Sequence, residues 1–112
     1  MKLESLKLRK HFEEFRTTKT HKYHGKYLVI LSLKKDIENP KLGIRISRKI
    51  GNAVRRNRIR RIIRETLRQN IAHIRPDCHY LIIPRAFTKE LSNRALSKEL
   101  REDLSRRFGF TL

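Results

Sequence analysis

Arginine is the residue type in this chain with the clearest potential for chemistry. Seven of the fourteen residues from 55 to 68 are arginine, and residues 41–64 contain ten basic residues and no acidic one. A guanidinium group presents a planar set of donors that matches the oxygens of a phosphate, and it stacks on nucleobases. This segment therefore predicts a surface that binds a polyanion.

Helical spacing sorts these arginines onto one side. We expect a helix that begins after Asn52, a candidate N-cap, and runs to about residue 73. At about 100° per residue, an arc of roughly 140° carries one asparagine and five arginines. We call this set the arginine ridge: Arg56, Asn57, Arg60, Arg61, Arg64 and Arg68. The opposite side is apolar and consists of Ile59, Ile62, Ile63 and Leu67.

Some members of the cluster have more than one possible role. Arg55 and Arg58 lie off the ridge and serve separate contacts or none. Asn57 is the one uncharged residue of the ridge, with one acceptor and two donors. It can bond a base edge or a ribose 2′-hydroxyl, or it can cap or orient the arginines beside it.

A merely solvated helix face is a weaker interpretation of the same residues. Such faces usually alternate in charge, because opposite charges four residues apart attract each other. The ridge helix contains a single acid, Glu65, whose favourable partner at that spacing is Arg61. The charge pattern favours an external anionic partner.

The whole chain is basic, with a net charge of +18 over 112 residues, a length that fits one domain. The candidate partners are nucleic acid and an anionic membrane surface. A membrane-surface helix usually carries bulky anchors such as Trp or Phe; this chain has no Trp, and the ridge helix contains no Phe. The apolar side of the ridge helix instead has the composition of a core-facing surface, which favours nucleic acid.

The sequence does not predict an autonomous active site. Cys78 and His79 are neighbours on an expected strand and point to opposite faces, which argues against a nucleophile–base pair. The carboxylate pairs Glu13–Glu14 and Glu102–Asp103 diverge by about 100° on helices, so neither pair forms a two-metal site. One cysteine, no long apolar run and no signal peptide predict a cytoplasmic protein.

The elements that must position the ridge alternate along the chain. We expect a first helix capped by Ser5 and a last helix ended by Gly109, with a polar loop over 17–26. The expected helices are 5–16, 53–73 and 89–108, and the expected strands are 27–33, 42–47 and 79–84. A further short strand gives the order α-β-β-β-α-β-α: a single α+β (α/β) domain over 1–112, in which three helices pack on a mainly antiparallel sheet of about four strands.

The segment "SRKIGNAVRRNRIRRIIRE" closely resembles the signature of the bacterial ribonuclease P protein family. That signature combines a glycine, an Ala-Val pair and an Arg-Asn-x-x-basic-basic core, followed by a basic residue one turn later. The matching positions are Lys49, Gly51, Ala53, Val54, Arg56, Asn57, Arg60, Arg61 and Arg64. Length, basicity and element order fit as well, so the resemblance covers nearly the whole chain.

The resemblance implies a function and a set of partners. Family members are monomeric proteins that join one catalytic RNA, and the complex removes the 5′ leader of precursor tRNA. The RNA carries the chemistry and holds most of the Mg²⁺, and no membrane is involved. The family fold also has a left-handed β-α-β crossover. The RNA-binding surface is expected to comprise Arg45, Arg48, Lys49, Asn52, Arg56, Asn57, Arg60, Arg61, Arg64 and Arg68.

The resemblance also implies a cleft for the leader between the first helix and the sheet. Phe12 and Tyr27 match aromatic positions of the family. Arg16 stands where a second aromatic is common, Phe15 lies one position earlier, and Ile30 stands where some members have tyrosine. We therefore expect Phe12, Phe15, Arg16 and Tyr27 to line a cleft that depends more on charge than on stacking. For both phenylalanines, core packing is the alternative.

Two other functions fit the composition alone. One is a ribosomal-type protein that only scaffolds RNA, and the other is a basic DNA-binding module. The ordered signature around Arg56 and Asn57 favours the ribonuclease P subunit over both.

Overall fold

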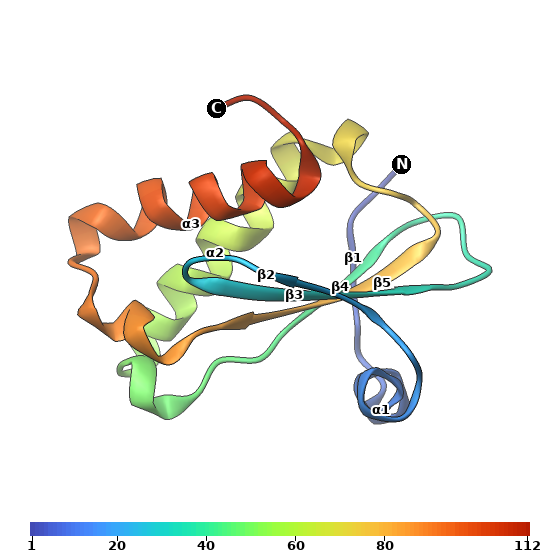
Figure 1. Cartoon of the computed structure of the whole chain (residues 1–112), viewed down its shortest axis with the longest axis horizontal. Coiled ribbons are helices and arrows are strands. Elements are labelled where there is room, and N and C mark those ends of the chain that lie inside the picture. The colour runs from blue at the N-terminus through green and yellow to red at the C-terminus, as the bar shows by residue number, and fades with distance from the viewer.

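The computed structural model describes residues 1–112, in which one mixed sheet separates helices on its two faces (Figure 1). Helices α2 and α3 cover one face, and α1 crosses the other. The strands are β1 (Glu4–Ser5), β2 (His21–His24), β3 (Leu28–Lys34), β4 (Lys41–Ile44) and β5 (Cys78–Pro84). The α-helices are α1 (Arg9–Thr17), α2 (Ala53–Gln69) and α3 (Asn93–Phe108). Three short 3₁₀ helices are η1 (Arg48–Ile50), η2 (Ile71–His73) and η3 (Ala86–Glu90).

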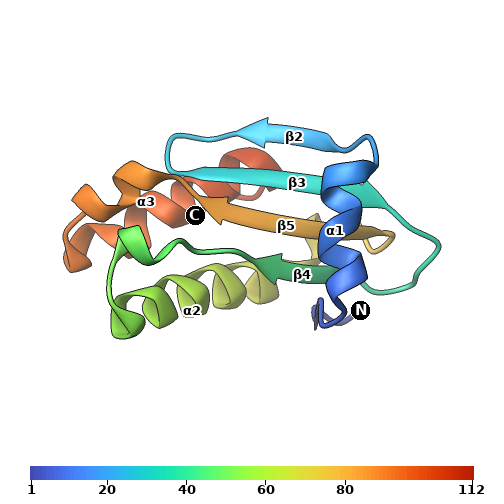
Figure 2. The same cartoon turned by 90° about the horizontal axis from the view of Figure 1, so that it is seen from below.

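The five strands are arranged in the order β1-β4-β5-β3-β2 (Figure 2). The pairs β1–β4 and β4–β5 are parallel, whereas β5–β3 and β3–β2 are antiparallel. The α+β class and the element order after β1 are confirmed. The sheet has one strand more than expected, and it is evenly mixed rather than mainly antiparallel. The crossover from β4 through α2 to β5 is left-handed, as the resemblance implied (Figures 1 and 2).

The two unexpected edge elements explain the difference. Strand β1 has two residues and β2 has four, so neither is long enough to show an alternating pattern. The expected loop over 17–26 contains β2, whose residues are mostly exposed at the edge of the sheet. Ser5 belongs to β1 and does not cap the first helix, which begins only at Arg9 with no side-chain cap. Glu4 and Ser5 therefore form a strand that pairs with β4, although the local sequence pattern predicts a helix there.

The larger core lies between the sheet and the pair α2–α3. Alternate residues of the long strands point into it, among them Leu28, Ile30 and Ile82, all fully buried. From the other side come Ile59, Ile63 and Leu67 of α2, and Leu96, Leu100 and Leu104 of α3. This packing fixes α2 along its apolar side, so its arginine side must face outward.

A smaller core lies beneath α1. Phe15 packs there with Leu31, Leu33 and Leu81 of the central strands. Phe12 lies directly on Gly43 of β4, where a Cβ atom would come within 2.6 Å of the ring. A glycine is therefore required at this position for α1 to approach the sheet so closely.

In the second half of the chain, the capping residues of the helices agree with the sequence predictions, and two of the helix bounds differ. The Asn52 side chain accepts a hydrogen bond from the Arg55 backbone N–H at 2.9 Å, which confirms the predicted cap of α2. Gly109 ends α3 in the left-handed region with φ of 77°, also as predicted. Helix α3 begins later than expected because Ser92 caps it, and the preceding residues form η3. Helix α2 ends at Gln69, and the last expected turn is the separate η2.

A buried carboxylate ties α3 to the turn between β2 and β3. Asp103 accepts hydrogen bonds from the backbone N–H groups of Lys26, Tyr27 and Leu28, at 3.3, 2.6 and 2.9 Å. A Cβ atom on Gly25 would meet the same carboxylate at 2.8 Å. This Asp103 clamp fixes the turn from one side chain of the last helix.

Candidate nucleic-acid interface

The arginine ridge occupies the outer side of α2. Ile59, Ile63, Thr66 and Leu67 are buried on its inner side, whereas every member of the ridge is exposed or half-buried. The amphipathic helix predicted from the spacing is therefore confirmed. The ridge is a row of guanidinium groups one turn apart, a geometry suited to successive phosphates.

Asn57 lies within the ridge and contacts one of its arginines. Its side-chain oxygen accepts a hydrogen bond from Nη1 of Arg60 at 3.0 Å. This contact matches the second of the two roles considered for Asn57, the orientation of a neighbour. The amide NH₂ of Asn57 has no partner within the protein and remains available as a donor at the surface.

Arg64 connects the ridge to the N-terminal segment. Its Nη1 donates to the hydroxyl of Ser5 in β1 at 2.8 Å. Burial lowers the pKa of Arg64 below its usual value, and the positive charges of Arg68 and Arg60 lower it further. No carboxylate offsets this crowding, so an anion beside Arg64 would relieve it.

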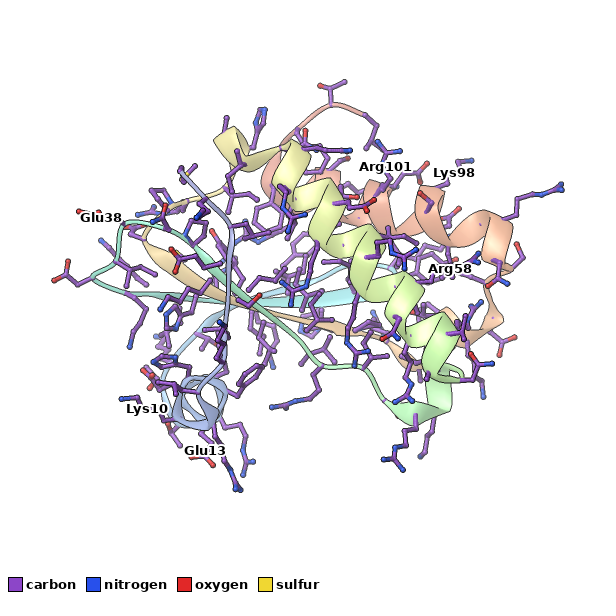
Figure 3. The ribbon with its side chains drawn as sticks, turned by 180° about the vertical axis from the view of Figure 1, so that it is seen from behind. Lys10, Glu13, Glu38, Arg58, Lys98 and Arg101 are labelled. Carbon is purple, nitrogen blue, oxygen red and sulfur yellow. The ribbon has the colours of Figure 1, made fainter.

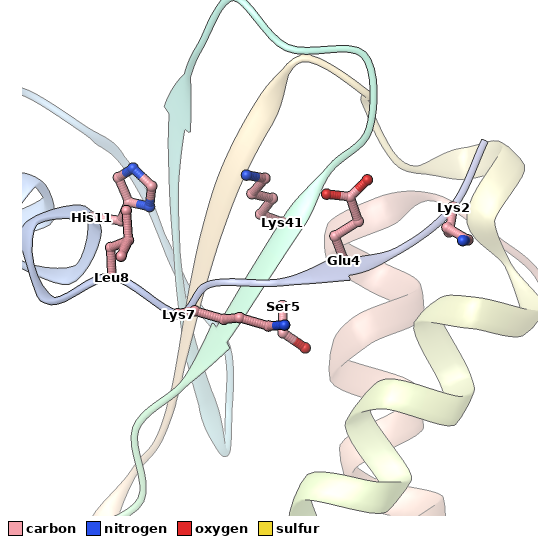
Figure 4. Close-up of a pocket in the computed structure, with 7 residues that line it drawn as sticks. All are labelled: Lys2, Glu4, Ser5, Lys7, Leu8, His11 and Lys41. Atoms are coloured by element: carbon pink, nitrogen blue, oxygen red, sulfur yellow. The ribbon is translucent and has the colours of Figure 1, made fainter.

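A basic pocket of about 580 Å³ continues the cationic surface beyond Ser5 (Figure 4). It lies between the N-terminal segment, β4 and the start of α1. Its walls include Lys2, Lys7, Lys41 and His11, with Glu4 as the one acidic residue. The sequence did not indicate this pocket, because the pairing of the two-residue β1 with β4 brings these lysines together.

Arg55 has a structural role and is directed away from the ridge. Its guanidinium donates to the backbone oxygens of Thr88 and Leu91 at 3.0 and 2.5 Å, and to Oδ1 of Asn93 at 2.8 Å. It therefore fastens the first turn of α2 to η3 and to the start of α3. Arg58 makes no such contact and lies on the side of α2 toward Lys98 and Arg101 of α3 (Figure 3).

The remaining predicted RNA-binding residues lie in the connection from β4 to α2. Arg45, Arg48 and Lys49 are exposed in and before η1, close in the chain to the N-terminus of α2. Asn52 uses its side-chain oxygen for the helix cap, so its defined contact is structural.

The four residues predicted for the leader cleft are not brought together. Phe12 is half-buried on Gly43 and Arg16 is exposed on α1, so both are accessible beside the sheet. Phe15 is only 6% exposed and belongs to the core beneath α1. Tyr27 packs against the larger core and lies edge-on to Phe87, with ring centroids 5.5 Å apart.

One buried histidine lies beneath α1. His79 is 2% exposed, and its Nδ1 has no hydrogen-bond partner. Burial, together with the positive charges of His11, Lys35 and Lys41, lowers its pKa to about 4. Its ring meets that of His11 edge-on at 4.9 Å. Two histidines alone do not form a metal centre, and no group of three or more His, Cys, Asp or Glu residues with metal-site geometry is present.

The fold and the ridge define a small α+β protein with a cationic helix face suited to a polyanion. None of its helices has the length and apolar character needed to cross a bilayer. The family model "Ribonuclease P" matches residues 1–108. The chain belongs to the ribonuclease P protein family.

Individual relatives agree with this assignment. The ribonuclease P protein component of Geotalea uraniireducens is 35% identical over 105 residues, covering 94% of this chain and 91% of the relative. The RNase P protein from Thermotoga maritima has a TM-score of 0.84 at 31% identity, with 94% of each chain covered. The Staphylococcus aureus protein has a TM-score of 0.79 at 27% identity, covering 95% of this chain and 96% of its own.

Proposed function

We propose that this chain is the protein subunit of an RNA-based ribonuclease P, binding both the catalytic RNA and the 5′ leader of precursor tRNA. The complex then cleaves the phosphodiester bond that releases the mature tRNA 5′ end. Membership of the family supports this role, and the arginine ridge is the observation that carries it. We expect one protein per RNA and a cytoplasmic location.

In this proposal the protein binds and the RNA catalyses. Guanidinium groups can hold and screen phosphates, but the ridge supplies neither a nucleophile nor a carboxylate pair for metal ions. The catalytic Mg²⁺ is accordingly assigned to the RNA. The protein's contribution is to lower the repulsion between the catalytic RNA and the precursor, and to hold the leader.

The leader is proposed to cross the sheet beside α1. Phe12 offers a half-buried ring for stacking, and Arg16 offers an exposed charge on the same helix. Tyr27 lies elsewhere, so this surface has fewer aromatic groups than the family pattern implied. Charge is therefore the main attraction, which predicts weak dependence on leader sequence.

Reconstitution tests the proposal directly. The chain is combined with its cognate catalytic RNA and a precursor tRNA, and leader cleavage is measured at near-physiological Mg²⁺. We expect faster cleavage than with the RNA alone. No enhancement would refute the proposal, and preferential binding to duplex DNA over structured RNA would favour the DNA-binding alternative.

A charge-matched pair of variants tests the ridge. Alanine at Arg56, Arg60, Arg61 and Arg64 should flatten the dependence of log affinity on log salt by somewhat under one unit per lost phosphate contact. Alanine at Lys89, Arg94, Lys98 and Arg101 removes the same charge from η3 and α3 and should leave the slope nearly unchanged. Equal slopes in the two variants would show that the ridge makes no specific phosphate contacts.

A further inference from the structure

A second basic pocket, of about 520 Å³, lies at the β2 edge of the sheet, opposite the edge that carries β1 and the ridge. Its walls come from β2, β3, the start of β5 and the end of α3. The function proposed above does not use it. Its polar lining consists of Lys19, His21, Ser32, Lys34, Arg75 and Arg107.

Strand register places His21, Ser32 and Lys34 on one face. His21 of β2 lies opposite Ser32 of β3, and Lys34 of β3 lies opposite Cys78 of β5. Residues 32 and 34 share the face that α3 covers, since side chains two apart along a strand point the same way. Arg107 reaches this face from the last turn of α3, with Nη2 at 3.4 Å from the Ser32 hydroxyl.

The charges of this pocket are only partly compensated. Asp77 forms two hydrogen bonds with Arg75, both at 3.0 Å, which neutralises that guanidinium and raises its pKa. Lys19, Lys34 and Arg107 form no salt bridge. Three positive charges therefore converge on the pocket without a salt bridge of their own, and Asp77, whose charge acts on Lys34, is already bonded to Arg75.

Among these residues, Arg107 gives the strongest indication that the pocket binds an anion. Its guanidinium stacks on Phe108, with Cζ 4.8 Å from the ring centroid, so packing fixes its position. Its Nε is buried and has no hydrogen-bond partner. A buried charged donor without an acceptor is unfavourable. Nη1 of the same guanidinium is not buried and has no partner within the protein, so an anion in the pocket can supply an acceptor there.

We propose that this pocket binds a phosphate group. The Arg107 guanidinium supplies the directional donors, Lys19 and Lys34 supply charge, and the Ser32 hydroxyl supplies a neutral donor. The phosphate is either free inorganic phosphate or the phosphodiester of an RNA strand passing the β2 edge. In the second case the protein contacts RNA at two opposite edges of its sheet.

Nuclear magnetic resonance of the full chain during titration with inorganic phosphate tests the site. The Arg107 Nε–H signal and the backbone amides of His21 and Lys34 should shift with a common saturation curve. The double variant K19Q/K34Q should weaken this curve by about tenfold, as expected for two lost charge contacts. The charge-matched control K89Q/K98Q should bind as the wild type does.

All four lysines are exposed, so neither double variant disturbs the core. Absence of a shift at Arg107 Nε–H, or equal weakening in both double variants, would overturn the proposal. A second titration uses a short RNA oligonucleotide without terminal phosphates. Shifts at the same signals that weaken in K19Q/K34Q assign the site to RNA phosphodiesters, whereas shifts with inorganic phosphate alone assign it to the free anion.

Discussion

At the residue scale, arginines that are adjacent in the chain have different roles. Arg55 is occupied by backbone oxygens of η3 and the following residues, whereas Arg56 is a member of the exposed ridge. Asn57 then holds Arg60 in place through its side-chain oxygen. Only some of the arginines are therefore available to a partner, and the neutral Asn57 orients one of them, Arg60.

The role of Asn57 can be separated from that of charge. We expect Asn57→Ala to weaken RNA binding about fivefold, because losing one orienting hydrogen bond costs about 1 kcal/mol. The salt dependence should not change, because no cation is removed. Fluorescence anisotropy over a salt series measures both quantities. Gln69→Ala, which removes an exposed amide at the end of the same helix, should have no effect, and a flatter slope for Asn57→Ala would contradict the orienting role.

His79 predicts a pH dependence of stability. Its pKa falls from 6.5 to about 4 on folding, because of burial and of the nearby His11, Lys35 and Lys41, only partly offset by Glu14. The unfolded chain therefore takes up a proton below pH 6.5 that the folded chain does not, and stability falls between pH 7 and pH 5. Urea unfolding should show a lower midpoint at pH 5 than at pH 7.

The variant His79→Phe should lose most of that difference. Carboxylates with lowered pKa values, Glu14 beside Lys35 and Asp77 beside Arg75, contribute stability that is lost only below their unfolded values of 4.5 and 3.8. They act outside the interval from pH 7 to pH 5. The same midpoint shift in His79→Phe and in the wild type would show that other groups cause it.

At the element scale, α2 presents its ridge because it is fixed along its inner side and at its first turn. The inner side packs on the larger core, and Arg55 ties the N-terminal turn to η3 and α3. Arg64 adds a third attachment to β1. The direction of the ridge therefore depends on the C-terminal part of the chain as well as on α2 itself.

Arg55 and Arg58 form a matched pair for testing this attachment. Arg55→Ala should lower the free energy of unfolding by about 2–3 kcal/mol, because two backbone oxygens and an amide lose a charged donor. Arg58→Ala removes the same charge from an exposed site and should change stability by less than about 0.5 kcal/mol. Urea unfolding of both variants decides the question, and similar losses would mean that Arg55 is not a specific attachment.

The sequence was most informative where a pattern was long. Seventeen residues of α2 display a full amphipathic period, so its buried side and its cap at Asn52 could be predicted. The edge strands could not, because β1 is stabilised by partners in β4, more than 30 positions away. Phe15 and Tyr27 show the same limit: an aromatic residue has the same local pattern in a core and in a cleft, and only tertiary packing distinguishes them.

At the scale of the whole molecule, the excess positive charge is spread over the ridge and two basic pockets. The net charge is +18, with 29 basic residues against 11 acidic ones, and only five salt bridges form. Self-repulsion therefore opposes folding, and anions that bind the folded surface should oppose unfolding.

This repulsion predicts a specific response to salt type. At equal ionic strength, sulfate should raise the melting temperature more than chloride does, because a divalent anion can bridge neighbouring guanidinium groups. Thermal unfolding followed by circular dichroism measures the difference. In the variant with alanine at Arg56, Arg60, Arg61 and Arg64 the extra effect of sulfate should shrink, and an undiminished effect would show that sulfate acts through general solvent exclusion.

The Asp103 clamp has a consequence for how the chain is made. The N–H groups of the turn between β2 and β3 donate their hydrogen bonds to a carboxylate 75 positions after Leu28. During synthesis the N-terminal hairpin emerges long before that carboxylate exists, and its three N–H groups must stay bonded to water until then. The first hairpin to leave the ribosome is thus among the last parts of the molecule to become fixed, once residue 103 has been translated and α3 has docked.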